Sequence, residues 1–274
     1  PDLEFFLRGG SGYDLGQTGC TTPAAPAPTD GVDVANQMLA EVQKALQDNT
    51  PQAEDRLALP DVLVTTAACL GIAVVAAVPG WIYLSGSFAL YLALIIGLMF
   101  FGIYVARRSP VSAPLALVYS AALGLMMGAF SHMAVGQGGN VALITQAIIG
   151  TFAGVIGMLA VYSTSWGKKA SRAYKLFAGL AIGYLVLGLA NIVAVLFGVG
   201  GGWGFYGVSG IGLVLCALGV ALAAWSLLID IGRADQAIQG GAPRSWSWSL
   251  GMSLASSIVW LYMELLRFLS IANR

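Results

Sequence analysis

Seven apolar stretches, each about as long as a helix that crosses a membrane, follow one another through the sequence after residue 60. They cover residues 61–79, 86–106, 111–134, 140–164, 174–198, 208–232 and 247–272. A helix needs about 20 apolar residues to cross the hydrocarbon core of a bilayer. Only 9% of the residues are charged, against about 25% in soluble domains. The sequence therefore predicts an all-α, polytopic membrane protein with seven transmembrane helices.

The order of the stretches favours three helical hairpins followed by a lone seventh helix. Pairs of glycines four residues apart occur at 124 and 128, at 150 and 154, and at 179 and 183. Such pairs allow membrane helices to approach closely. We therefore expect ordinary small-residue packing within the bundle, which residues 57–274 would form.

An acidic arm, residues 1–56, precedes this predicted bundle. Residues 1–60 carry nine acidic and three basic residues, whereas residues 61–274 carry four acidic and ten basic ones. A linker rich in Pro and Ala lies at 22–28, and residues 30–48 have the apolar spacing of an amphipathic helix. That helix either docks on a partner or on the membrane surface, or it is simply solvated. Nucleic acid is not an expected partner, because the basic residues are spread over loops.

The connections between the stretches differ sharply in basic residues. Those near residues 80–85, 135–140 and 199–207 contain no Lys or Arg. The alternate connections carry Arg107, Arg108, Lys168, Lys169, Arg172, Lys175, Arg233 and Arg244. Loops rich in Lys and Arg stay in the cytoplasm. We expect a multi-pass protein of the cytoplasmic membrane with its N-terminus inside and its C-terminus outside, unless the last segment is a re-entrant hairpin.

Two carboxylates lie within apolar stretches, Asp230 and Glu264. An ionisable residue at the centre of a membrane helix costs about 2.5–3.5 kcal/mol on insertion scales, and such residues mark functional sites. Glu264 has an alternative partner in Arg267, one turn later, although Arg267 could instead extend towards the interface. The alternative for Asp230 is an interfacial acid, because polar residues that include Asp235 follow it.

A contact between the two acids would create a proton-sensitive site. Two carboxyls in a poorly solvated place share a proton, and their oxygens suit a transient divalent cation such as Ca²⁺. A helix that starts at Ser247 puts Glu264 about 25 Å from its cytoplasmic end, whereas Asp230 is close to that end. The two meet only if the polar stretch folds inward or the last helix is tilted or broken. The sequence leaves both arrangements open.

Enzyme chemistry finds no support in the sequence. It contains no HExxH, no Gly-x-Ser-x-Gly and no phosphate-binding Gly-x-x-x-x-Gly-Lys-Ser/Thr motif. A lone histidine, His132, and three dispersed cysteines do not make a metal site. We expect neither catalysis nor a resident cofactor.

The C-terminal third carries a recognisable pattern. It runs Ser226-Leu227-Leu228-Ile229-Asp230, then Gly241-Ala242-Pro243, then Val259-Trp260-Leu261-Tyr262-Met263-Glu264-Leu265-Leu266-Arg267-Phe268-Leu269-Ser270. This pattern resembles the Bax inhibitor-1 family, and most closely its bacterial, actinobacterial-type branch. The resemblance spans roughly residues 57–272, and it implies six helices in hairpins around a central seventh.

The resemblance also implies a function, a pH-sensitive calcium leak gated by a carboxyl pair on the sixth and seventh helices. Asp230 and Glu264 match that pair, and Arg107 or Arg108 would stand for the family's gating arginine. Two acids of related sequences are replaced here, by Leu123 and by Gly232. Some bacterial members instead modulate a membrane protease. The alternative function is therefore a non-transporting accessory subunit of a larger membrane complex, such as a protease or a respiratory assembly, docked through residues 1–56.

Overall fold

The computed structural model divides the chain into two units, residues 1–50 and 51–274. It describes residues 30–49, 56–84, 86–108, 110–136, 140–202, 204–207 and 209–273. The predicted linker at 22–28 lies outside the described residues. In the first unit, one helix, α1 (Asp30–Asn49), occupies the stretch where an amphipathic helix is predicted. Its apolar side chains at Val34, Met38 and Val42 are exposed and recur every four residues.

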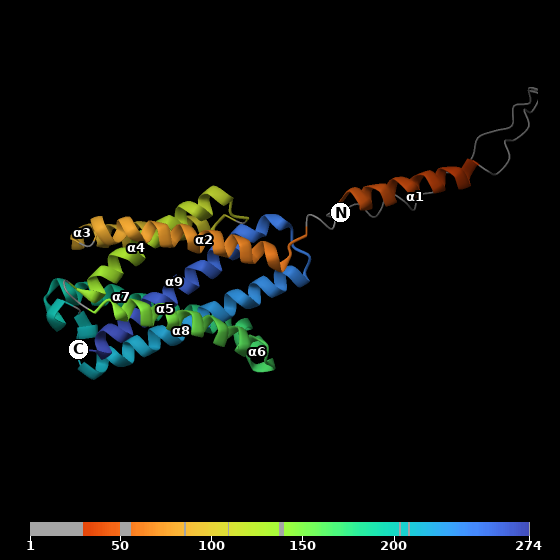
Figure 1. The fold of residues 1–274 in the computed structure, drawn as a ribbon. Coiled ribbons are helices and arrows are strands. Elements are labelled where there is room, and N and C mark those ends of the chain that lie inside the picture. The colour runs from red at the N-terminus through yellow and green to blue at the C-terminus, as the bar shows by residue number, and fades with distance from the viewer. Residues whose placement is uncertain are drawn as a thin grey trace, which may run out of the picture. The chain divides into compact units, whose positions relative to one another are not determined.

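The second unit is a bundle in which all seven apolar stretches fold as helices (Figure 1). They are α2 (Leu59–Pro79), α3 (Phe88–Ala106), α4 (Ala113–Val135), α5 (Ala142–Tyr162), α7 (Tyr174–Leu196), α8 (Ser209–Gln239) and α9 (Ser247–Ala272). A short helix, α6 (Ser165–Arg172), joins α5 to α7, and single turns lie at Gly80–Leu84, Val199–Gly202, Gly204–Gly207 and Arg244–Trp246. The described residues contain no strand beyond one isolated bridge.

Six of the helical segments are long and apolar enough to cross a membrane. The exception is α3, whose apolar part, Ala89–Val105, is shorter than the others. The structure thus confirms an all-α, polytopic membrane protein. Seven full crossings stay a prediction, because one of them depends on α3.

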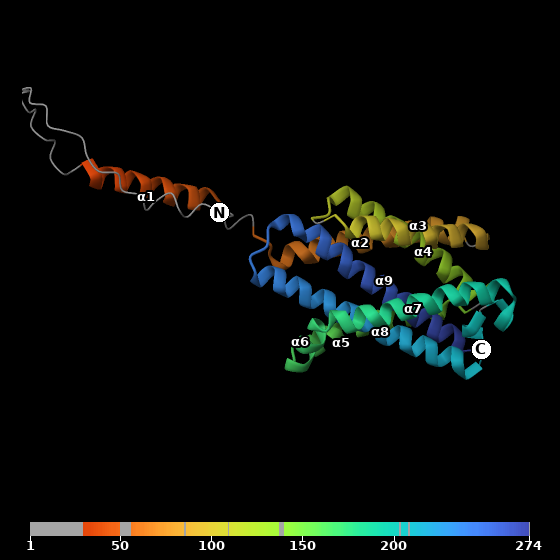
Figure 2. The same cartoon turned by 180° about the vertical axis from the view of Figure 1, so that it is seen from behind.

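Helix α9 occupies the centre of the bundle, and it packs against α2, α4, α5 and α8. In both views α2, α3 and α4 lie on one side of α9, and α5, α7 and α8 lie on the other (Figures 1 and 2). The grouping into consecutive hairpins is seen only in part, because α2 packs chiefly along α4 rather than along α3. The three connections that carry the basic residues lie at one end of the bundle (Figure 2).

Glycines explain why α2 pairs with α4. A Cβ atom added at Gly124 would collide with the backbone of Ala73, and one added at Gly128 would collide with that of Ala77. Only glycine lets the two backbones come this close. The predicted pair at 179 and 183 behaves differently, since a Cβ atom there would meet nothing within 4 Å.

The basic end of the bundle is held by a tie between the start of α2 and the turn from α8 to α9. Arg56 forms an isolated antiparallel bridge with Pro243, and the amide of Leu57 donates to the carbonyl of Ala242 at 2.9 Å. Arg244 and Asp61 form an ion pair at 2.9 Å. The turn itself uses Gly241 at a positive φ of 66°, a conformation that glycine adopts easily.

Candidate functional site

Two carboxylates are buried in the bundle along the α8–α9 seam, meaning the line of contact between these two antiparallel helices. Asp230 projects from α8 and Glu264 from α9, and their residues are 6% and 2% exposed. Each carboxylate has its own set of partners. We call these sets the Asp230 cluster and the Glu264 cluster.

The Glu264 cluster contains a complete ion pair. Nη1 of Arg267 lies 2.9 Å from each of the two carboxylate oxygens of Glu264. The indole Nε1 of Trp260 donates to one of these oxygens at 3.1 Å, and the hydroxyl of Tyr184 donates to the other at 3.0 Å. The local pair predicted as the alternative for Glu264 is therefore what the structure contains, with two further donors from α7 and α9.

Aromatic rings enclose the guanidinium of Arg267. Its Cζ lies 4.9 Å from the ring centre of Tyr206 and 5.2 Å from that of Phe130, distances at which cation–π attraction operates. The hydroxyl of Tyr206 donates to that of Tyr184 at 3.1 Å, so the turn Gly204–Gly207 reaches into the cluster. Burial raises the pKa of the Tyr206 hydroxyl above its ordinary value. Arg267 does not extend to the interface, and its charge is balanced inside the bundle.

The Asp230 cluster is built from hydroxyls. Ser257 and Ser253, one turn apart on α9, donate to the two carboxylate oxygens of Asp230 at 2.5 and 2.8 Å. Ser226 of α8 lies 2.7 Å from the Ser257 hydroxyl. Since Ser257 gives its only hydrogen to Asp230, Ser226 must be the donor in that contact. The nearest cation, Arg233, is 3.6 Å away, and 58% of its side chain is exposed.

The structure does not bring the two carboxylates together. Ser257 and Glu264 are seven residues apart, which is about 10 Å along α9. On α8 the carboxylate of Glu264 faces Gly219, and Asp230 follows eleven residues later, about 16 Å along the axis. No hydrogen bond or ion pair joins the two acids in the described part of the chain. A proton or a Ca²⁺ ion shared by both is therefore not a feature of this conformation.

The separation follows from the length of α8. This helix was expected to end near residue 232, yet it continues to Gln239, so the polar residues after Asp230 form two more helical turns. They do not fold back towards Glu264. Asp230 is consequently not an interfacial acid at a helix end, because it lies buried between α8 and α9. Within the described residues, no three His, Cys, Asp or Glu side chains gather as metal ligands would.

Three other predicted residues, Asp235, Arg107 and Arg108, lie away from the seam. Asp235 accepts hydrogen bonds from the Tyr162 hydroxyl at 2.6 Å and from Gln239 at 2.9 Å, so it ties α8 to α5. Arg107 and Arg108 are exposed at the end of α3, and Arg108 lies over the ring of Tyr104 at 4.9 Å. In the described structure neither arginine forms an ion pair with either acid.

One replaced acid has a steric explanation. A Cβ atom at Gly232 would lie 2.7 Å from the side chain of Ser171, because α6 packs closely against α8 there. An aspartate at this position has no room unless α6 moves. Leu123, at the other replaced position, is buried in α4.

Apart from Arg267, the partners of the two acids were not predicted from the sequence. Tyr184 and Tyr206 come from segments far from Glu264 in the chain, and no local spacing indicates them. The serines did leave a signal, since Ser249, Ser253 and Ser257 recur every four residues along one face of α9. A polar stripe of that kind on an apolar helix predicts a partner on the facing helix.

The comparisons with known proteins agree with this architecture. No curated protein matches the chain. The sequence model of the family described as Bax inhibitor 1 like matches residues 36–274, which include the whole bundle and the second part of α1. The match begins well before residue 57, where the resemblance was expected to start. This multi-pass membrane protein belongs to the Bax inhibitor 1 like family.

Proposed function

We propose that the protein is a pH-sensitive cation leak channel of the cytoplasmic membrane, with its N-terminus in the cytoplasm and Ca²⁺ as the expected ion. The proposed role is transport rather than catalysis. One observation supports it: two buried carboxylates stand at different positions along the α8–α9 seam of a largely apolar bundle. Ionisable groups inside a membrane bundle mark ion or proton pathways. In this proposal Asp230 and Glu264 act as two separate sites, one after the other along the seam, and not as the contacting pair that the resemblance implies.

The Asp230 cluster has the chemistry of a transient cation-binding site on a permeation path. Its side-chain partners within the bundle are oxygens, supplied by Ser253, Ser257 and Ser226. Carboxylate and other oxygen ligands suit a hard cation such as Ca²⁺. Hydroxyls can also turn from donors to acceptors. If Asp230 takes up a proton, it becomes a donor and the chain of hydroxyls reverses. Occupation by a cation and occupation by a proton therefore compete at this carboxylate.

The Glu264 cluster has the features of a closed gate. The guanidinium of Arg267 occupies the seam between Tyr206 and Phe130, and Glu264 holds it there. Protonation of Glu264 would leave Arg267 without its counter-charge. A buried cation without a partner is unfavourable, so Arg267 would move and the seam would open. The other titratable groups that face the pair are Tyr184, Tyr206, Tyr91 and Cys216.

Calcium flux into proteoliposomes, measured from mildly acidic to mildly basic pH, tests the proposal. We expect wild-type flux to depend on pH, and Asp230→Asn and Glu264→Gln each to shift or abolish that dependence. Asp235→Asn is the matched control, because this acid lies on α8 outside the seam. No flux above that of empty liposomes, with folded protein, would reject the channel.

The accessory function keeps support from one feature, the exposed apolar side chains of α1. A helix of this kind is suited to bind a groove on another protein. Its four acidic residues, Asp30, Asp33, Glu41 and Asp48, do not favour binding to anionic lipid. Co-purification of a membrane complex with the full chain, and its loss on deletion of residues 1–56, would favour this second candidate. An unchanged partner profile after the deletion would exclude it.

A further inference from the structure

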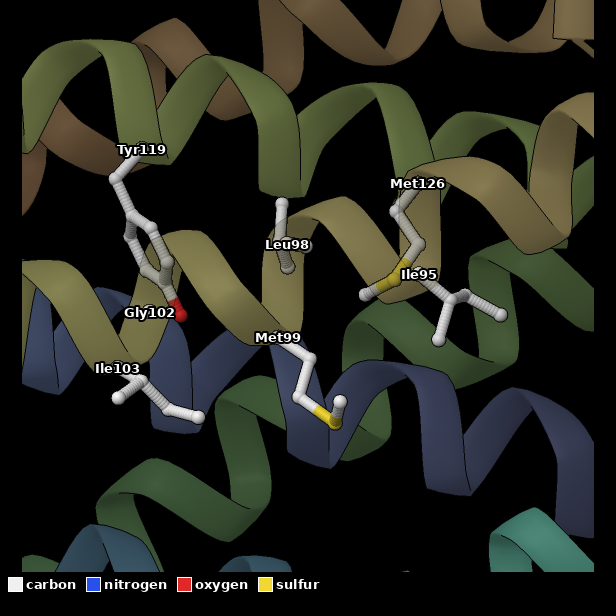
Figure 3. A pocket seen from close by; sticks show the side chains of 7 residues that line it. All are labelled: Ile95, Leu98, Met99, Gly102, Ile103, Tyr119 and Met126. Atoms are coloured by element: carbon white, nitrogen blue, oxygen red, sulfur yellow. The ribbon is translucent and has the colours of Figure 1, made fainter.

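An apolar groove of about 480 Å³ runs between α3 and α4, away from both carboxylate clusters. Figure 3 shows the side chains that line it, Ile95, Leu98, Met99, Gly102, Ile103, Tyr119 and Met126. Apart from the hydroxyl of Tyr119, these side chains carry no polar oxygen or nitrogen. The lining residues are half-buried, and Ile103 is exposed.

Two features of α3 create the groove: the helix has few neighbours, and one residue of the groove wall is a glycine, Gly102. α3 packs on α4 and makes few contacts with the other helices. Gly102 leaves open a place that a side chain would fill, and a Cβ atom there would meet the ring of Tyr119 at an ordinary 3.5 Å. Two methionines, Met99 and Met126, give the walls flexible surfaces that adapt to different shapes.

The groove has a cationic end. Arg107 follows Ile103 by one helical turn, and Arg108 lies beside it over the ring of Tyr104. Both arginines are exposed, and neither has an acidic partner among the residues that the structure describes. They follow α3 in its connection to α4, which lies at the same end of the bundle as α6 and the α8–α9 turn (Figure 2).

We propose that this groove binds a phospholipid with an anionic headgroup, one acyl chain lying between α3 and α4 and the phosphate bound by Arg107 and Arg108. The dimensions suit a lipid. From Ile95 to Arg107 the helix rises about 18 Å, and one leaflet of the hydrocarbon core is about 15 Å thick. The charges also suit it, because basic residues at the membrane surface attract anionic lipids.

Photo-crosslinking with a lipid that carries a diazirine in its acyl chain tests the site. The full-length protein is reconstituted in phosphatidylcholine vesicles with the probe supplied as phosphatidylglycerol or as phosphatidylcholine. We expect labelled peptides from 95–103 and 119–126, with phosphatidylglycerol labelling several-fold more than phosphatidylcholine. Arg107→Gln together with Arg108→Gln should lower the phosphatidylglycerol labelling several-fold, to about the level of phosphatidylcholine, because these two cations provide the preference for the anionic headgroup.

Two pairs of matched variants distinguish specific lipid binding in the groove from non-specific attraction of anionic lipid to basic residues. Gly102→Leu fills the groove and should abolish labelling, whereas Gly97→Leu on the same helix meets nothing within 4 Å and should not. Lys168→Gln with Lys169→Gln removes the same charge from α6, and it should leave the labelling of α3 unchanged. If Gly102→Leu does not fold, Met99→Trp fills the same space.

Three results would overturn the proposal. Equal labelling in the Gly97 and Gly102 variants would show that the acyl chain does not occupy the groove. An equal loss in the lysine and arginine double variants would show general surface attraction. Equal labelling by the two lipids would show that Arg107 and Arg108 bind no anionic headgroup.

Discussion

The two carboxylates of the α8–α9 seam are buried to a similar degree, yet they are held in opposite ways. Glu264 is neutralised by the guanidinium of Arg267, which rings enclose on both sides. Asp230 keeps its position through serine hydroxyls, and its nearest cation is exposed to the surroundings of the bundle. The comparison teaches that burial alone does not set a carboxylate's role. In the function that we propose, the charge of its partner decides whether the group locks a structure or exchanges a proton or an ion.

The largest expected effect follows from the removal of Arg267. In Arg267→Met, Glu264 stays buried without its counter-charge, and loss of one member of a buried ion pair costs about 3–5 kcal/mol. Thermal unfolding of the purified protein in detergent measures the loss. Arg267→Met combined with Glu264→Gln should recover much of the stability, because no charge is then left unpaired. A double variant as unstable as the single one would show that the rings, and not the ion pair, hold this end of the seam.

A smaller effect is expected at the Asp230 cluster. Ser257→Ala removes the hydrogen bond to Asp230 and leaves Ser226 without its acceptor, at a cost of about 2 kcal/mol. Thr151→Val is the control, because its hydroxyl is buried as well but bonds only to a carbonyl of its own helix. We expect little change in unfolding temperature for this control. If both variants lose the same stability, the hydroxyl chain contributes nothing specific to Asp230.

The smallest effect should come from Arg233. Its side chain is mostly exposed and its nitrogen is 3.6 Å from Asp230, so Arg233→Gln should change the free energy of unfolding by no more than about 0.5 kcal/mol. The pH dependence of calcium flux should also stay close to that of the wild type. A loss as large as that of Arg267→Met would mean that both carboxylates are held by ion pairs, and the contrast between them would disappear.

Much of the fold could be predicted because its signals are local. Each apolar stretch specifies a helix by its own length and composition, and the spacing of Glu264 and Arg267 puts them on one face of a helix. The basic residues of the connections mark one end of the bundle in the sequence as they do in space. These features require no knowledge of which helix packs against which.

The remainder depends on contacts between distant segments. The register of α8 against α9 places Asp230 opposite Ser253 and Ser257, and no pattern within either helix fixes it. The pairing of α2 with α4 depends on a fit between glycines and alanines that only the assembled bundle reveals. Tyr206 belongs to a turn outside the spans, so its place beside Arg267 was equally hidden.

The central position of α9 determines the order in which the bundle can assemble. A chain is made from its N-terminal end, so α2 to α8 are produced before the helix that lies between them. Until α9 arrives, the groups α2–α4 and α5–α8 have few contacts with each other. α9 then brings Glu264 and Arg267 into the membrane together, as a pair whose charges cancel. A chain that ends before residue 247 would therefore lack the helix that joins its two halves.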